Sequence, residues 1–225
     1  MIFKKQQLAK MLEMQLLMNN EINNDWLNLN WDFLRAAMVE GVEAIDYYGW
    51  KWWKKQDLDL EQLQIELVDI WHFYLSFYLK GSSGDIELTA KRIIEDINDS
   101  SVKFSYLNGV EYNLDQMSFL EKMDLFIAFS ALKKTNLVLF FSICNDVELS
   151  FEKLYRGYIC KNVLNIFRQK KGYKSGIYEK IWFGKEDNVW LLDAAESLDI
   201  NSVLYVDLLF SKLEEIYNNV IESKL

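Results

Sequence analysis

The 225-residue chain carries 34 acidic and 25 basic side chains, and its net charge of −9 argues against general nucleic-acid binding, which needs a basic surface. It contains no proline, so nothing in the sequence forces a helix to break, and we expect a largely helical, single domain over residues 1–225. Its longest apolar run, residues 137–144, is far too short to span a membrane, and residues 1–10 lack the apolar centre of a signal peptide. Both observations favour a cytoplasmic protein. Cys144 and Cys160 fit this location, because two cysteines in apolar surroundings of so large a chain are expected to be buried free thiols.

The first half of the chain predicts three helices. Apolar residues recur at helical spacing over 5–18. A second helix is expected from a cap at Asn28 or Asn30 to about Lys55, and a third from Asp59 to just before Gly81, because Asp59 and Gln62 form a capping-box pattern.

The second half predicts further helices separated by loops. The expected helices cover 85–98, 115–144, 147–170, 188–197 and 201–223, and the expected loops cover 98–114 and 172–188. The pattern is typical of an all-α, multi-helix bundle. The chain shows no internal repeat and no glycine-rich phosphate motif, so any phosphate binding must use side chains and metal ions.

Two acidic pairs stand out, Glu40 with Glu43 and Glu66 with Asp69, each at i, i+3 within a predicted helix. This spacing places both carboxylates of a pair on one helix face, and four converge if the helices lie side by side. Carboxylates so crowded repel one another unless divalent cations neutralise them. The alternative is two solvated helix faces, but several tryptophans and the only histidine, His72, crowd the same region and argue against it.

Residues 161–185 hold seven Lys or Arg against one Glu, so this segment carries +6 and the rest of the chain −15. A cationic patch that faces an acidic cluster suits a metal-bound phosphate ligand. The alternative is a solvated basic helix end and loop. Because Gly172 and Gly176 flank Lys174 in a loop that carries several like charges, we expect this loop to become ordered only around a phosphate chain.

Glu40-Gly-Val-Glu43 and, 22 residues later, Glu66-Leu-Val-Asp69 resemble the signature of the all-α NTP pyrophosphatases. Other segments narrow the resemblance to the dimeric dUTPases, and it covers about residues 15–190. These segments are Gln15–Asn19, Trp52–Lys55, Glu66–Phe73 and Lys161–Gly176 followed by Glu186-Asp187-Asn188. Leu16 and Leu17 depart from the more polar first motif expected there.

The resemblance implies hydrolysis of dUTP and dUDP to dUMP with two or three Mg²⁺ per site, held by Glu40, Glu43, Glu66 and Asp69. Water would attack the α-phosphorus, with Glu43 or Asp69 as the base, and Mg²⁺ would lower the pKa of the water. The residues that the resemblance assigns to the phosphates are Lys54, Lys161, Asn165, Arg168, Tyr173, Lys174 and Asn188.

For the base, an amide offers both a donor and an acceptor, so Gln15 and Asn19 can match the O4 and N3–H edge of uracil. Cytosine reverses that edge and would leave an amide unpaired. Phe73 resembles the ring that stacks on uracil, and Trp53 and His72 would shape the base and sugar pocket.

The resemblance also implies a homodimer, and the apolar stretch over 125–143 is a natural interface because it exceeds what one buried helix face needs. We expect no nucleic-acid or membrane partner. Two alternatives remain: a related pyrophosphatase acting on dCTP or a wider nucleotide range, and a helical interaction module without catalysis.

Overall fold

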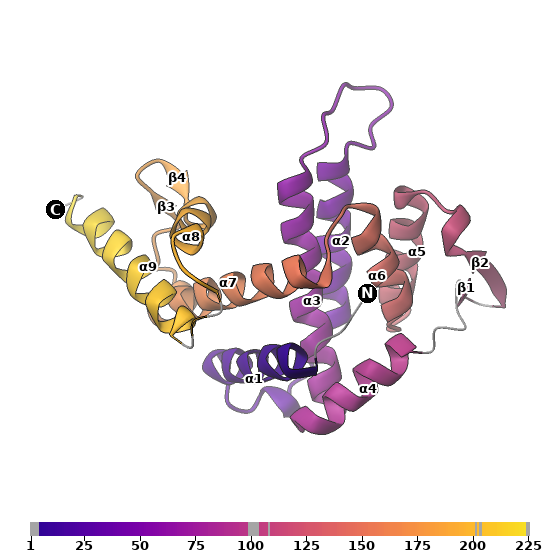
Figure 1. Ribbon diagram of the computed structural model, residues 1–225, viewed down its shortest axis with the longest axis horizontal. Helices are drawn as coiled ribbons and strands as arrows, with labels where there is room; N and C mark the ends of the chain where they lie inside the picture. Colours follow the sequence, from indigo (N-terminus) through magenta and orange to yellow (C-terminus); the bar gives the residue numbers. More distant parts are fainter. Residues whose placement is uncertain (1–4, 99–103, 108, 201, 203, 224–225) are drawn as a thin grey trace.

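The computed structural model describes residues 5–98, 104–107, 109–200, 202 and 204–223. Helices dominate this part of the chain, which confirms the all-α prediction (Figure 1). They are α1 (Lys5–Ile22), α2 (Phe33–Tyr48), α3 (Leu60–Gly81), α4 (Ile86–Asn98), α5 (Phe119–Ala131), α6 (Leu137–Asp146), α7 (Phe151–Lys170), α8 (Asp187–Glu196) and α9 (Tyr205–Glu222). The shorter elements are the 3₁₀ turns η1 (Trp26–Asn28), η2 (Leu114–Gln116) and η3 (Tyr173–Ser175) and the strands β1 (Phe104–Leu107), β2 (Val110–Asn113), β3 (Ile181–Trp182) and β4 (Lys185–Glu186).

The helices α2 and α3 lie side by side and form the centre of the molecule, with α5 and α6 on one flank (Figure 1). On the other flank α7 crosses α3 and extends to α8 and α9, while α1 runs beside α7. Within the described residues, no helix is both long enough and apolar enough to span a bilayer.

The apolar stretch over 125–143 packs into the chain's own core. Trp71 of α3 stacks on Phe140 with ring centroids 5.7 Å apart and an angle of 9°. Phe126, Phe129 and Phe141 are buried as well, and of the large apolar residues in this stretch only Leu132 is exposed. The prediction that this stretch forms a dimer interface is therefore wrong, because its side chains are buried against α2, α3 and α4.

The second helix is shorter than predicted at both ends. Asp32, not Asn28 or Asn30, is the N-cap, because its side chain accepts a hydrogen bond from the backbone N–H of Arg35. The helix ends at Tyr48 and not near Lys55, because Gly49 adopts φ +84°, a left-handed conformation that closes a helix. The third helix begins as predicted, with Asp59 accepting from Gln62 N.

The region predicted as one helix over 115–144 forms two. The helix α5 begins at a capping box in which Ser118 and Glu121 bond each other's backbone N–H groups. It stops before Lys133, whose φ of +59° cannot continue a right-handed helix, and Asn136 caps α6. The turn between them lets two short apolar helices pack side by side where one long helix could not.

Both predicted loops contain short antiparallel hairpins. Part of 98–114 forms β1 and β2, with Tyr106 opposite Glu111, although residues 99–103 and 108 lie outside the described part. The 172–188 segment contains η3 and the β3–β4 pair, which turns at Gly184 with φ +82°. The last predicted helix begins at Tyr205 rather than at 201, and residues 201 and 203 are not described.

The contact of α7 with α3 is close enough to exclude a methyl group. A Cβ built at Gly157 would lie 2.9 Å from Cγ2 of Val68, and a β-branched valine has little room to move. We expect Gly157→Ala to lower the free energy of unfolding by about 1 kcal/mol, because overpacking outweighs the gain in helix propensity. Urea denaturation measures this value.

Val68→Ala removes the methyl group that would clash. The double variant should therefore be more stable than the sum of the two single changes predicts. Strict additivity would show that the two helices are not in the contact described.

Candidate active site

The helices α2 and α3 bring three carboxylates together. Oxygens of Glu40, Glu43 and Glu66 all lie within 4.8 Å of one another, and we call these residues the carboxylate cluster. The i, i+3 spacing puts the first two on one face of α2, and the packing of α2 on α3 brings Glu66 opposite them. An all-oxygen, anionic donor set of this kind fits a hard divalent cation such as Mg²⁺.

Burial makes the cluster hold a proton in the metal-free protein. Burial, together with the hydrogen bond with Glu40 and the charge of Asp69, raises the pKa of Glu66 to about 8. Burial also raises the pKa of Glu40, although the bond from Glu66 opposes that shift. Glu66 and Glu40 therefore share a proton near neutral pH, which a bound cation would displace.

The fourth predicted ligand, Asp69, turns toward a lysine. Its Oδ2 lies 2.8 Å from Nζ of Lys161 on α7. Burial raises the pKa of Asp69, and the charge of Lys161 lowers it. Asp69 raises the pKa of both Glu40 and Glu66, so it lies near the cluster without being part of it.

Beside Asp69, α1, α3 and the start of α2 enclose a crevice of about 510 Å³, which we call the amide crevice. It brings together six residues expected in the site from the sequence: Gln15, Asn19, Asp69, His72, Phe73 and Asn165. Its other walls include Trp31, Asp32, Arg35 and Ser76.

The polar groups of the amide crevice form a continuous network. Gln15 Nε2 donates to Asn19 Oδ1 at 3.1 Å, and Asn19 Nδ2 donates to Ser76 Oγ at 3.0 Å. His72 Nδ1 lies 2.8 Å from Gln15 Oε1, and Tyr158 OH donates to the same oxygen at 2.9 Å. Because an amide oxygen only accepts, His72 Nδ1 is the donor and Nε2 is a bare acceptor.

His72 is neutral. Burial, and secondarily the charge of Lys161, lowers its pKa to about 3. Its ring stacks on Tyr158 at 4.1 Å, and Nε2 has no hydrogen-bond partner within the described residues. A neutral, unpaired acceptor thus lies beside the amides.

The sequence interpretation missed Tyr158 and Asn162, which support this network from α7. Asn162 Nδ2 donates to Tyr158 OH at 3.3 Å and to the backbone oxygen of Met14. A signal was present, because Tyr158, Asn162 and Asn165 recur at helical spacing on the segment that also holds Lys161.

Farther along α7, Arg168 is held by a buried carboxylate. Its Nε and Nη2 donate to the two oxygens of Asp187 at 2.8 and 2.7 Å, and Tyr178 OH donates to Asp187 at 2.8 Å. Arg168 Nη1 donates to Asn165 Oδ1 at 3.3 Å. The fork holds the guanidinium of Arg168 in the last turn of α7.

Lys174 is also engaged, since Nζ donates to the backbone oxygen of Ile22 at 3.0 Å. Tyr173 is exposed, with Arg168 over its ring at 5.9 Å. Asn188 and Lys161 line a second, mostly apolar crevice of about 280 Å³ between α3, α7 and α8.

Trp53 and Lys54 are not brought to the carboxylate cluster or the amide crevice. Both are exposed on the loop between α2 and α3, where Trp53 makes edge contacts with Trp50 and Trp52 at 5.2 and 5.4 Å. The carboxylate cluster and the amide crevice lie on either side of Asp69, which binds Lys161. Such an arrangement can hold a metal-bound phosphate chain joined to a small polar ring.

The raised pKa of Glu66 makes stability depend on pH. Because this pKa is about 8 in the folded protein and near 4.5 when unfolded, the folded protein binds more protons between these values. We expect the free energy of unfolding in EDTA to fall from pH 6.5 to pH 8, as measured by urea denaturation at each pH.

Glu66→Gln is the matched control, because glutamine keeps the hydrogen bond and does not titrate. Its stability should change less over the same interval. Equal slopes for the two proteins would remove Glu66 as the proton-holding group.

Comparison with known proteins gives one family assignment. A scan against protein-family models matches residues 7–173 to dUTPase. A comparison with curated proteins finds no match. The matched range covers α1, α2, α3 and α7, which carry the carboxylate cluster, the amide crevice and Lys161. The chain belongs to the all-α dUTPase family and is a dUTP diphosphatase.

Proposed function

We propose that this protein hydrolyses dUTP, and also dUDP, to dUMP in a Mg²⁺-dependent reaction in which water attacks the α-phosphorus. The observation that carries the proposal is that the carboxylate cluster and the amide crevice adjoin each other at Asp69. Asp69 borders the carboxylate cluster, binds Lys161 at 2.8 Å and also lines the amide crevice. A nucleotide with its base among the amides would therefore extend its phosphates toward the carboxylates.

Glu40, Glu43 and Glu66 would hold Mg²⁺, and Asp69 would join them once Lys161 moves to a phosphate. Two or three ions per site are proposed, since four carboxylates exceed what one ion needs for neutrality. When bound, Mg²⁺ supplies charge neutralisation of the phosphates and a lower pKa for water.

Glu43 is the better candidate for the base. It is the exposed member of the carboxylate cluster, whereas Asp69 is paired with Lys161. A carboxylate that accepts a proton from water must keep a lone pair directed at it. The ion pair gives Asp69 a different task, which is to hold Lys161 at the phosphate end of the crevice until substrate arrives.

Lys161, Asn165 and Arg168 would bind the β- and γ-phosphates from α7. Nε and Nη2 of Arg168 each donate one hydrogen bond to Asp187, which leaves one N–H on Nη2 and one on Nη1 for another acceptor. A phosphate can therefore bind Arg168 without breaking its pair of bonds to Asp187. The remaining proposed phosphate ligands, Tyr173, Lys174, Asn188 and Lys54, need a movement of their segments or of a neighbouring subunit. The functional unit that we propose is a homodimer.

The amide crevice suits uracil. Gln15 and Asn19 each keep an N–H for O4, and His72 Nε2 can accept from N3–H. Cytosine offers an acceptor at N3, which would oppose a neutral histidine acceptor and leave both groups unpaired. Phe73 lines the same crevice and would stack on the base, and Trp53 would complete the pocket.

We expect Glu43→Gln and Asp69→Asn each to lower kcat for dUTP by at least ~100-fold, the scale of losing a catalytic group. Helical content, measured by circular dichroism, should stay unchanged because the carboxylates repel one another without metal.

Glu95→Gln on the exposed face of α4 is the control and should keep full activity. Near-normal turnover at saturating Mg²⁺ in either site variant would exclude that residue from the site.

Turnover of dUTP in ¹⁸O-labelled water tests the proposed reaction as a whole. We expect dUMP and pyrophosphate as products, with the label in dUMP and no turnover in EDTA. Label in pyrophosphate would show attack at the β-phosphorus, and dUDP plus phosphate as products would contradict the proposed cleavage site.

A further inference from the structure

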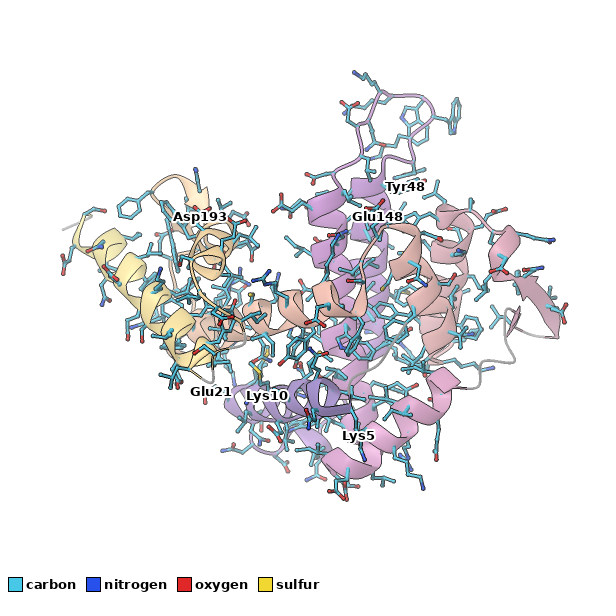
Figure 2. All side chains as sticks on the ribbon, viewed as in Figure 1. Lys5, Lys10, Glu21, Tyr48, Glu148 and Asp193 are labelled. Carbon is cyan, nitrogen blue, oxygen red and sulfur yellow. The ribbon has the colours of Figure 1, made fainter. Side chains whose placement is uncertain are left out.

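The hydrogen bonds of the amide crevice all run in one direction, from α7 through α1 to α3. Tyr158 OH donates to Gln15 Oε1 at 2.9 Å. Gln15 Nε2 donates to Asn19 Oδ1 at 3.1 Å, and Asn19 Nδ2 donates to Ser76 Oγ at 3.0 Å. A last bond leads from Ser76 Oγ to the backbone oxygen of His72 on the same helix. These side chains are buried in the space that side chains fill where α1, α3 and α7 meet (Figure 2).

Such a network has a second possible polarity. Rotation by 180° exchanges the donor and the acceptor of an amide with almost no change in its shape. If both amides rotate, Asn19 Nδ2 donates to Gln15 Oε1, and Gln15 Nε2 donates to His72 Nδ1. His72 would then carry its proton on Nε2 instead of Nδ1. Packing alone therefore does not select between the two arrangements.

The residues at the α7 end do not select the polarity either. Tyr158 OH lies 2.8 Å from the backbone oxygen of Met11 and 2.9 Å from Gln15 Oε1. Because a hydroxyl both donates and accepts, Tyr158 can donate to Gln15 in one arrangement, and in the other it can accept from Gln15 while it donates to Met11. His72 also fits both arrangements, since a neutral imidazole has one donor and one acceptor in either tautomer.

Ser76 differs because its only proton is already used. Ser76 Oγ lies 3.1 Å from the backbone oxygen of His72 but 3.5 Å from Asn19 Oδ1, so the better bond goes to His72. A serine within a helix can bond the backbone oxygen four residues earlier in this way. The lone pairs of Oγ then face Asn19, which must present its NH₂ group. The reversed network needs the same proton for Asn19 and would break the bond to His72.

We propose that Ser76 is a positioning residue that fixes the polarity of this network, and thereby the tautomer of His72 and the choice of base. In the observed arrangement His72 Nε2 is a bare acceptor and Gln15 keeps a second N–H, which match N3–H and O4 of uracil. In the reversed arrangement His72 Nε2–H and Gln15 Oε1 would match N3 and the amino group of cytosine. The choice of base rests on the proposed function, whereas the tautomer does not.

The tautomer can be measured directly, because His72 is the only histidine in the chain. In protein labelled with ¹⁵N-histidine and free of nucleotide, we expect NMR to show the proton on Nδ1 and none on Nε2, with long-range ¹H–¹⁵N couplings to distinguish the two nitrogens. Ser76→Ala removes the group that orients Asn19. Both tautomers should then be populated, so the ¹⁵N shifts of the two nitrogens move towards each other.

Ser130→Ala is the matched control. It removes another buried serine hydroxyl, on α5 and outside the amide crevice, and should leave both ¹⁵N shifts unchanged. Alanine favours helix, so circular dichroism of Ser76→Ala should match that of the wild type. A wild type with the proton on Nε2 would overturn the proposal without any variant, and so would a folded Ser76→Ala protein with wild-type shifts.

Turnover of dUTP and dCTP tests the choice of base. We expect Ser76→Ala to raise kcat/KM for dCTP by about 5-fold, the worth of one hydrogen bond, and to lower kcat/KM for dUTP by a smaller factor. A merely structural role would lower both values. Ser130→Ala should keep the wild-type ratio of the two.

The two measurements separate the possible failures. A shifted tautomer without a gain in dCTP turnover would overturn Ser76 as a determinant of base choice. A wild type that turns over no dUTP, but in which Ser76→Ala shifts the tautomer, would instead reject the proposed function and leave the role of Ser76 in the network standing.

Discussion

Mutual repulsion among carboxylates held within 4.8 Å of one another is the constraint around which this structure is organised. The cluster persists because apolar packing holds its two helices together, with Ala37 and Ala44 of α2 and Leu63, Leu67 and Ile70 of α3 all buried. The electrostatic cost is relieved by a retained proton on Glu66 and Glu40 and by Lys161 beside Asp69. The core thus stabilises an arrangement that the charges by themselves oppose.

The helix α7 carries three side chains that contact different parts of the candidate site. Along its length it presents Tyr158 to the amide network, Lys161 to Asp69 and Arg168 to Asp187. Because these residues lie on one helix, the distances between the amide network, the Asp69–Lys161 pair and the Arg168–Asp187 fork depend on helix geometry rather than on loop conformations. The close approach at Gly157 sets how deeply this helix sits against α3.

Local features of the sequence predicted local structure well. The cap of α3 follows from Asp59 and Gln62 alone, and the shared face of Glu40 and Glu43 follows from helical spacing. The break at Lys133 and the end of α2 at Gly49 depend on backbone conformations that apolar periodicity does not report. The orientation of Asp69 toward Lys161 arises from the tertiary packing of α3 on α7, so no pattern within either segment contains it. The same is true of the separation between the α2–α3 loop, which carries Trp53 and Lys54, and the amide crevice.

The state of His72 affects how the enzyme's acidity can be studied. It is the only histidine in the chain, and its pKa of about 3 keeps it uncharged throughout the neutral range. An imidazole that does not ionise contributes no inflection to a pH–rate profile. Inflections near neutrality in such a profile would therefore report groups other than this histidine.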